Sequence, residues 1–145
     1  KIKIDKSVNQ LIKEENNYGI KDFRTYQKFG EKVYNIRNNV IKNLNKLKKQ
    51  GKKIIGYGSP AKATTALNFF GTTDQIDFIV EDNKLKHNKY IPGVKIPIYS
   101  KNKVKDKNNI TLVLDWNFFE EIKKNNQSLS NKFINIKALE DNLID

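Results

Sequence analysis

The 145-residue chain has no cysteine and a single histidine, His87. It can therefore form neither a disulfide framework nor a thiolate metal site, and one histidine excludes a metal site built from several. No apolar run approaches the ~20 residues that span a bilayer, and residues 1–5 lack the apolar segment of a signal peptide. We expect a cytoplasmic protein with no metal and no membrane partner, and, since the chain starts without Met, one cut from something longer.

Arginine is also scarce, although the formal net charge is +12. Of the 28 basic side chains only Arg24 and Arg37 are arginine, and the lysines are spread among Asn and Ile instead of forming an Arg-rich strip with interleaved aromatics. Nucleic-acid-binding domains gather such residues on one face. The composition therefore predicts no specific nucleic-acid partner, only weak and salt-sensitive binding.

The most informative stretch runs from Lys53 to Lys62, where apolar β-formers lead into a glycine turn and then a helix. Gly56-x-Gly58-x-x-Ala61 matches the dinucleotide-type pattern, in which glycines permit a tight turn and close approach of a ligand. Amide groups at the start of the helix would face an anion. The alternative is a glycine-rich turn of a parallel α/β domain that binds nothing there.

Two residues of this stretch favour the ligand-binding interpretation. Pro60 suits the first turn of a helix, where its missing N–H costs no hydrogen bond. Lys62 puts a cation where the helix dipole does not favour one. The competing interpretation of Lys62 is a solvated surface lysine, since the chain is rich in lysine.

Hydrophobic periodicity predicts strands alternating with helices. We expect a connector and short helix in residues 1–20, followed by a single domain in residues 21–145 that starts with a long helix over 21–50. The apolar stripe of this helix, from Phe23 to Leu47, should face the core, with the helix packing along the sheet or a neighbouring domain. The fold class predicted is α/β: a Rossmann-like, doubly wound, mostly parallel sheet of about five strands with a long N-terminal helix added. The expected strands lie at 54–57, 75–82, 94–98, 110–115 and 133–136, and a helix at 61–70.

Polar residues follow two further strands. Glu81 and Asp82 lie near the ~20-residue separation at which a dinucleotide fold places its ribose-binding carboxylate; for Glu81 we favour simple exposure to water. Trp116 and Asn117 follow a later strand, and their plain roles are packing and helix N-capping. Because ligands bind beyond the carboxyl ends of parallel strands, we expect one cleft formed by residues 56–62, 82–86 and 116–117, with 83–93 as a candidate binding loop.

Several of these segments together resemble a known family. Gly56-Tyr-Gly-Ser-Pro-Ala-Lys62, Asp82-x-x-x-Lys86, Tyr90-x-Pro-Gly93 with Ile96-Pro-Ile98, and Trp116-Asn117 occur in the order found in the C-terminal domain of the SAM-dependent sugar C-methyltransferases. Those enzymes methylate a carbon of a nucleotide-linked deoxy-keto sugar. The similarity runs from about Ser7 to Phe133. Departures are His87-Asn88, where the family usually has Gln-Gly, and Asp115, where it has a small or apolar residue.

The resemblance implies a domain that helps to hold the nucleotide-sugar substrate against a separate, intramolecular SAM-binding domain. S-adenosylmethionine would bind mainly to that domain, and we expect no cofactor and no catalytic residue within this chain alone. His87 mismatches the family, so the base that deprotonates the sugar would also lie elsewhere. The implied substrate-binding residues are Gly56, Tyr57, Gly58, Ser59, Pro60, Ala61, Lys62, Asp82, Lys86, Trp116 and Asn117.

Two other classes of function stay open. Gly56-x-Gly58-x-x-Ala61 and Asp82, taken alone, suit an NAD(P)-binding oxidoreductase domain, although Pro60 and Lys62 are uncommon in that fingerprint. The basic surface would also suit a non-catalytic interaction module for acidic partners, whose affinity would collapse between low and moderate salt.

Overall fold

The computed structural model describes residues 5–141, and the chain divides into two compact units, residues 1–35 and 36–145. The first unit holds α1 (Lys6–Tyr18) and the beginning of α2 (Phe23–Lys49). The Asp5 carboxylate caps α1 by accepting a 2.8 Å hydrogen bond from the Ser7 amide. Gly19 ends it in the left-handed conformation, at φ 83°. The domain boundary expected after residue 20 stays a prediction.

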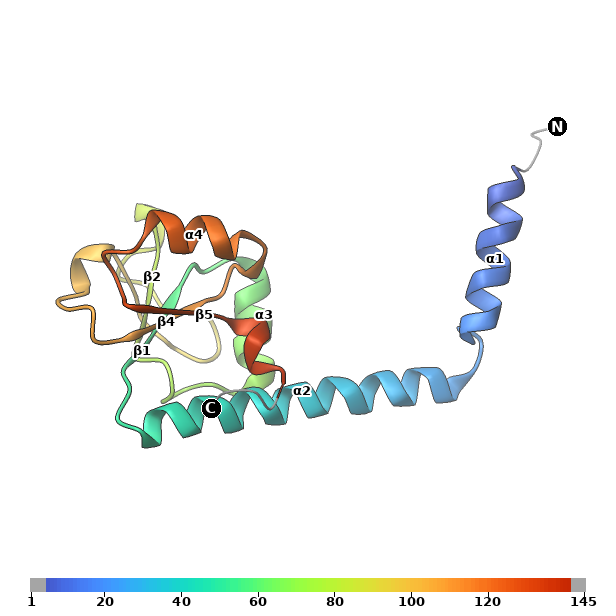
Figure 1. The fold of residues 1–145 in the computed structure, drawn as a ribbon, viewed down its shortest axis with the longest axis horizontal. Helices are drawn as coiled ribbons and strands as arrows, with labels where there is room; N and C mark the ends of the chain where they lie inside the picture. Colours follow the sequence, from blue (N-terminus) through green and yellow to red (C-terminus); the bar gives the residue numbers. More distant parts are fainter. Residues whose placement is uncertain (1–4, 142–145) are drawn as a thin grey trace. The chain divides into compact units, whose positions relative to one another are not determined.

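The second unit is built on a parallel five-stranded sheet (Figure 1). Its strands are β1 (Ile54–Tyr57), β2 (Phe78–Val80), β3 (Ile98–Tyr99), β4 (Ile110–Val113) and β5 (Lys132–Asn135). Their spatial order is β3-β2-β1-β4-β5, and each neighbouring pair is parallel. The chain first proceeds outward from β1 on one side and then returns to the other, so the switch point lies between β1 and β4. The predicted α/β, Rossmann-like fold class is confirmed.

Helices cover both faces of this sheet (Figure 1). Successive strand residues point to opposite faces, and in β1 Ile54 joins a core with α3 (Ala61–Phe70) and the second half of α2, whereas Ile55 joins the other core. That second core includes Ile122 of α4 (Phe119–Asn125). Short 3₁₀ turns complete the unit: η1 (Lys84–Lys86), η2 (Lys101–Lys103), η3 (Trp116–Phe118) and η4 (Ile136–Leu139).

The apolar stripe of α2 is only partly buried. Val40, Leu44 and Leu47 are in the core, as expected, but Phe23 is 72% exposed and Phe29 66% exposed, so the expectation of a core-facing stripe is wrong for these aromatics, and packing on a neighbouring domain stays a prediction for them. The exposed aromatics belong to the first unit, whereas the buried residues of the stripe belong to the second. Within residues 5–141, no helix combines the length and apolarity needed to cross a membrane.

Two strands are shorter than predicted. The 94–98 segment contributes only Ile98–Tyr99, because Lys95 adopts a left-handed φ of 58° that interrupts an extended chain. Pro97 has no N–H to offer, and β3 accordingly lies at the edge of the sheet. The 75–82 segment is a strand only over Phe78–Val80, which leaves Glu81 and Asp82 beyond the strand end.

Candidate functional site

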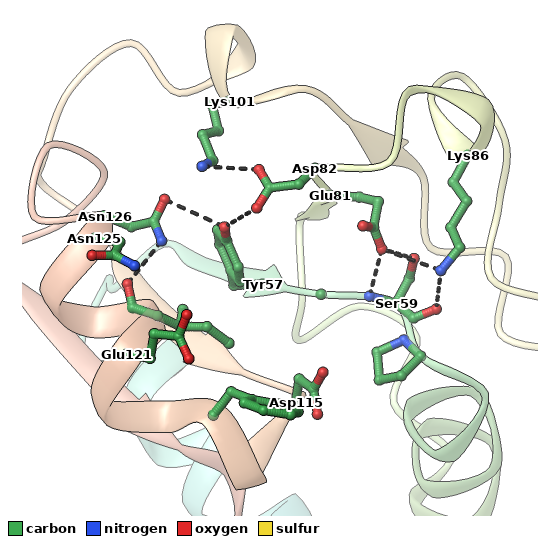
Figure 2. Close-up of a pocket in the computed structure, with 14 residues that line it drawn as sticks. Tyr57, Ser59, Glu81, Asp82, Lys86, Lys101, Asp115, Glu121, Asn125 and Asn126 are labelled. Atoms are coloured by element: carbon green, nitrogen blue, oxygen red, sulfur yellow. Dashed lines mark hydrogen bonds and ion pairs between the residues drawn. The ribbon is translucent and has the colours of Figure 1, made fainter.

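A cavity of about 520 Å³ opens at the carboxyl ends of β1, β2 and β4 (Figure 2). This is the edge where parallel α/β sheets bind ligands. Its walls come from the turn after β1, the end of β2, the η2 turn and α4. Six of the residues implied by the resemblance line it: Tyr57, Gly58, Ser59, Pro60, Asp82 and Lys86.

The turn between β1 and α3 depends on its two glycines. Gly58 has φ 84°, a conformation that side chains disfavour, and its amide donates a 2.8 Å hydrogen bond to the Val80 carbonyl. A Cβ on Gly56 would lie 2.8 Å from Cγ1 of Ile79. Both glycines therefore serve the close packing of β1 against β2.

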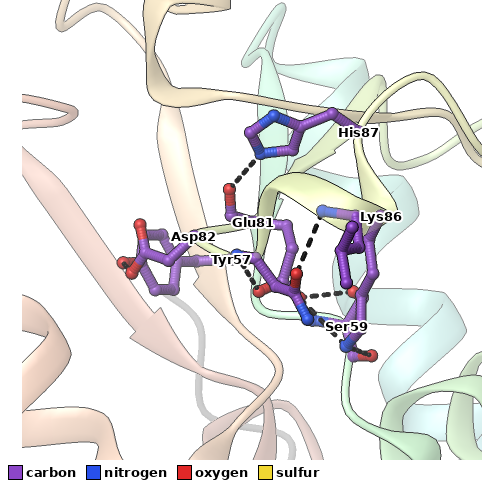
Figure 3. Close-up of polar contacts among 8 residues, drawn as sticks. Tyr57, Ser59, Glu81, Asp82, Lys86 and His87 are labelled. Atoms are coloured by element: carbon purple, nitrogen blue, oxygen red, sulfur yellow. Dashed lines mark hydrogen bonds and ion pairs between the residues drawn. The ribbon is translucent and has the colours of Figure 1, made fainter.

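Glu81 places a carboxylate at the start of α3 (Figure 3). Its Oε2 accepts hydrogen bonds from the Ser59 amide at 2.9 Å and the Ser59 hydroxyl at 2.5 Å, and its Oε1 accepts one from the Asn83 amide at 3.0 Å. Burial opposes ionisation, but these bonds and the Lys86 ammonium outweigh it and lower the pKa of Glu81 to about 2. The interpretation of Glu81 as a strand-end acid exposed to water is therefore wrong.

The loop after β2 is tied to the same turn. The Lys86 ammonium donates a 2.9 Å hydrogen bond to the Ser59 carbonyl and lies 3.4 Å from Oε2 of Glu81. The ring of His87 does not line the cavity; its Nε2 lies 2.7 Å from the Glu81 carbonyl oxygen. Lys86 thus closes one wall of the cavity, and His87 holds the loop.

A second polar cluster forms around Asp82. Its Oδ2 accepts a 2.6 Å hydrogen bond from the Tyr57 hydroxyl, and its Oδ1 lies 2.8 Å from the Lys101 ammonium. The Tyr57 hydroxyl also lies 3.3 Å from Oδ1 of the buried Asn126. Burial and the bond to Asp82 raise the pKa of Tyr57; the pKa of Asp82 is lowered, because Lys101 and Tyr57 outweigh the effect of burial. Tyr57 is a neutral donor, and Asp82 a charged acceptor.

The other five implied residues do not line the cavity: Gly56, Ala61, Lys62, Trp116 and Asn117. The Lys62 ammonium lies 2.5 Å from Oδ1 of Asp115 and 4.5 Å from the centre of the Trp116 ring. Asn117 lies inside η3, and α4 begins only at Phe119. The prediction that Asn117 caps this helix is therefore wrong, because a 3₁₀ turn precedes it.

Eight lining residues were not among those implied by the sequence. Glu121 and Asn125, which are four residues apart and share a face of α4, could have been found from helical periodicity. The sequence did not indicate Lys101 as a site residue, since it lies in a stretch with the composition of a charged surface. Within residues 5–141, no group of three His, Cys, Asp or Glu side chains could hold a metal ion. The eight are Glu81, Lys101, Asp115, Phe118, Glu121, Ile122, Asn125 and Asn126.

The sequence of this chain matches known proteins. A family model described as the C-methyltransferase C-terminal domain matches residues 1–136. The chain is also 30% identical over 118 residues to the C-methyltransferase NovU of Streptomyces niveus, a match covering 80% of this chain and 28% of NovU. It thus spans little more than a quarter of that relative's length. The resemblance drawn from the sequence motifs is confirmed, and the chain belongs to the family of C-methyltransferase C-terminal domains.

Proposed function

We propose that this domain holds a nucleotide-linked deoxy-keto sugar while a separate SAM-binding domain transfers a methyl group to a carbon of that sugar. The observation that carries the proposal is the cavity at the carboxyl ends of β1, β2 and β4, where polar side chains from several elements converge. Ligand sites of α/β proteins are concave, lie at this edge and combine apolar walls with a few polar groups. Membership of a C-methyltransferase family supplies the type of reaction.

S-adenosylmethionine, which supplies an electrophilic methyl group when bound, is proposed to bind outside this domain. Dinucleotide-type sites offer turn amides to phosphate and a strand-end carboxylate to ribose. Here the Ser59 amide donates to Glu81, and Asp82 is engaged by Tyr57 and Lys101. These contacts do not fit a nucleoside cofactor in the turn, and they count equally against an NAD(P) site.

The base that removes a proton next to the ketone is also proposed to lie elsewhere. A general base must reach the proton that it abstracts. His87 is the only histidine of the chain, and its Nε2 contacts the Glu81 carbonyl oxygen away from the cavity. The role of this domain would then be to bind and orient the substrate.

Exposed apolar residues of the first unit support a partner domain. Contiguous apolar surface marks interaction sites, and in α2 the exposed aromatic side chains recur at the helical spacing that places them on one face. Because NovU is more than three times as long as the matched region, we propose that the SAM-binding domain of a longer protein covers this surface. The residues are Val8, Leu11, Ile12, Tyr18, Phe23, Tyr26, Phe29 and Tyr34.

A comparison of Phe29→Ser in two contexts tests this contact. In the 145-residue chain Phe29 is exposed, so the substitution should change the free energy of unfolding by less than about 0.5 kcal/mol. In the longer protein the same substitution should lower the melting temperature and expose the first unit to protease. Equal behaviour in both contexts would rule out the contact.

Asp82→Asn in the longer protein tests substrate binding. Loss of a charged acceptor should weaken binding of a TDP-linked keto sugar by about tenfold or more, with the affinity for S-adenosylmethionine unchanged. Asp77→Asn is the matched control, because Asp77 precedes the same strand and pairs with Lys48 at 2.9 Å. The proposal fails if both variants bind the sugar nucleotide as tightly as the parent protein, measured by calorimetry.

The phosphate-binding role of Lys62 stays a prediction. Its ammonium is paired with Asp115 in the structure, so a phosphate would have to compete with that carboxylate. If Lys62→Ala in the longer protein leaves both substrate affinity and turnover unchanged, Lys62 does not bind the substrate.

A further inference from the structure

The cavity has a charge opposite to that of the chain. Four carboxylates line it, from Glu81, Asp82, Asp115 and Glu121, but only two lysines, Lys86 and Lys101. Each of these lysines already lies close to one of the carboxylates, and Lys62, which does not line the cavity, pairs with Asp115, so only Glu121 keeps its charge without a lysine partner among the described residues. Although the chain as a whole carries +12, the carboxylates of the cavity outnumber the lysines that neutralise them, so the cavity does not favour a diphosphate.

Glu81 occupies the position that a phosphate would need. The Ser59 amide, the Ser59 hydroxyl and the Lys86 ammonium are the donors that a phosphate at the start of α3 would use. All three contact Oε2 of Glu81, at 2.9, 2.5 and 3.4 Å. The Asn83 amide holds the other carboxylate oxygen at 3.0 Å. The anion held by the donors of the glycine turn is thus the carboxylate of Glu81, a side chain of the protein itself (Figure 3).

The remaining groups suit hydroxyls. Carboxylate oxygens accept more than one hydrogen bond, so Asp82 and Glu121 can accept from O–H groups, while the Asn125 amide can donate or accept. Phe118 and Ile122 offer apolar surface in the same cavity. A ring with hydroxyls at its edge and C–H groups on its face matches both kinds of lining.

We propose that the cavity takes the neutral, hydroxyl-bearing ring of the substrate and that Glu81 is a specificity determinant that keeps the diphosphate away from the glycine turn. This inference rests on the proposed function and deepens it, because it assigns the two halves of the substrate to different places. The diphosphate then lies outside the turn formed by Gly56 to Lys62.

Inorganic pyrophosphate is the probe for the turn, with the Ser59 amide resonance of the ¹⁵N-labelled 145-residue chain as the readout. In the parent chain millimolar pyrophosphate should leave this resonance unmoved. In Glu81→Gln it should shift the resonance and bind at least about tenfold tighter. Glu121→Gln, which removes a cavity carboxylate without a contact to Ser59, should behave like the parent. If the Gln variant does not fold, Glu81→Ala serves in its place.

In the pyrophosphate comparison, two results overturn the inference: a pyrophosphate-dependent shift of Ser59 in the parent chain, or no gain in pyrophosphate affinity when Glu81 is neutralised. A titration with TDP-glucose distinguishes a failure of this inference from a failure of the proposed function. It should shift resonances of Asp82 and Asn125 but not that of Ser59. If it shifts no cavity resonance, the proposed function fails, while the pyrophosphate comparison still decides the role of Glu81. If it shifts Ser59 in the parent chain, substrate binding stands and the exclusion of the diphosphate is wrong.

Discussion

The hydroxyl of Tyr57, the last residue of β1, donates a 2.6 Å hydrogen bond to the carboxylate of Asp82, just beyond β2. The two strands are neighbours in the sheet, and Lys101 joins the same carboxylate from the η2 turn after β3. One carboxylate thus links three successive strand ends, and with them one side of the cavity.

Tyr57→Phe should lower the free energy of unfolding by about 1.5–3 kcal/mol, the range for a hydrogen bond to a charged group. The ring keeps its place in the core, since Tyr57 is only 5% exposed, so the loss reports the hydroxyl. Urea denaturation of parent and variant gives the difference. Tyr99→Phe is the control: Tyr99 packs edge-on against Phe78, and its hydroxyl has no hydrogen bond to the described residues. Equal losses in both variants would contradict the assigned role.

Stability at acidic pH should depend on Glu81. Its pKa is about 2 in the folded chain against an ordinary 4.5, so its contribution is fully present above about pH 4.5 and is lost as the pH falls towards 2. Allowing for solvent at the cavity mouth, we expect a contribution of about 1–2 kcal/mol. Denaturation of the parent chain and of Glu81→Gln over this pH range should show their difference in stability shrinking as the pH falls.

Glu120→Gln provides the comparison for the pH scan. Glu120 lies at the exposed first turn of α4, so this variant subtracts the general effect of removing one negative charge. A difference between parent and Glu81→Gln that stays constant from pH 5 to about pH 2 would show that the bonds from Ser59 and Asn83 do not stabilise the ionised carboxylate.

The fold could be predicted from local patterns, but more than half of the residues that line the site could not. The continuous apolar run from Ile110 indicates a strand buried on both faces. The glycine turn after β1 indicates where a strand leads into a helix. Together such patterns are enough to predict a parallel α/β sheet. The contact between Ser59 and Glu81 joins residues 22 apart, and it exists only because β1 and β2 are adjacent. Nothing in the neighbourhood of Glu81 in the sequence distinguishes it from a solvated acid.

The long helix shows a second limit of sequence patterns. Periodicity identifies which face of α2 is apolar but not what covers that face. Leu44 is buried against the sheet and Phe29 is exposed, although both belong to the same stripe. The periodicity of α2 therefore does not identify what, if anything, contacts its exposed part.

Gly56→Ala should destabilise the domain by about 1–3 kcal/mol through overpacking. A Cβ there would meet Cγ1 of Ile79 at 2.8 Å and Cδ1 of Leu114 at 3.1 Å, both in the core. Gly30→Ala is the matched control with the opposite sign. It lies within α2 with nothing within 4 Å of the added Cβ, so it should stabilise the chain by about 0.5–1 kcal/mol. Thermal unfolding measures both; a neutral Gly56→Ala would show that the strands can separate to admit the methyl group.

Lys62 and Asp115 should be energetically coupled, because their charged atoms lie 2.5 Å apart and both side chains are about a third exposed or less. In a double-mutant cycle with Lys62→Met and Asp115→Asn we expect a coupling energy of about 0.5–1 kcal/mol, falling with added salt. A cycle without coupling would mean that the pair is not formed in solution.

The single tryptophan provides an independent measure of where the Lys62 side chain lies. The Lys62 ammonium lies 4.5 Å from the centre of the Trp116 ring, whereas that of Lys137 lies 5.8 Å away. Since Trp116 is the only tryptophan, intrinsic fluorescence reports its surroundings alone. Lys62→Met should change the emission more than Lys137→Met does, because a cation's effect on the ring weakens with distance. The reverse order would place the Lys62 side chain away from the ring and leave it free to reach a phosphate, as the sequence motif had indicated.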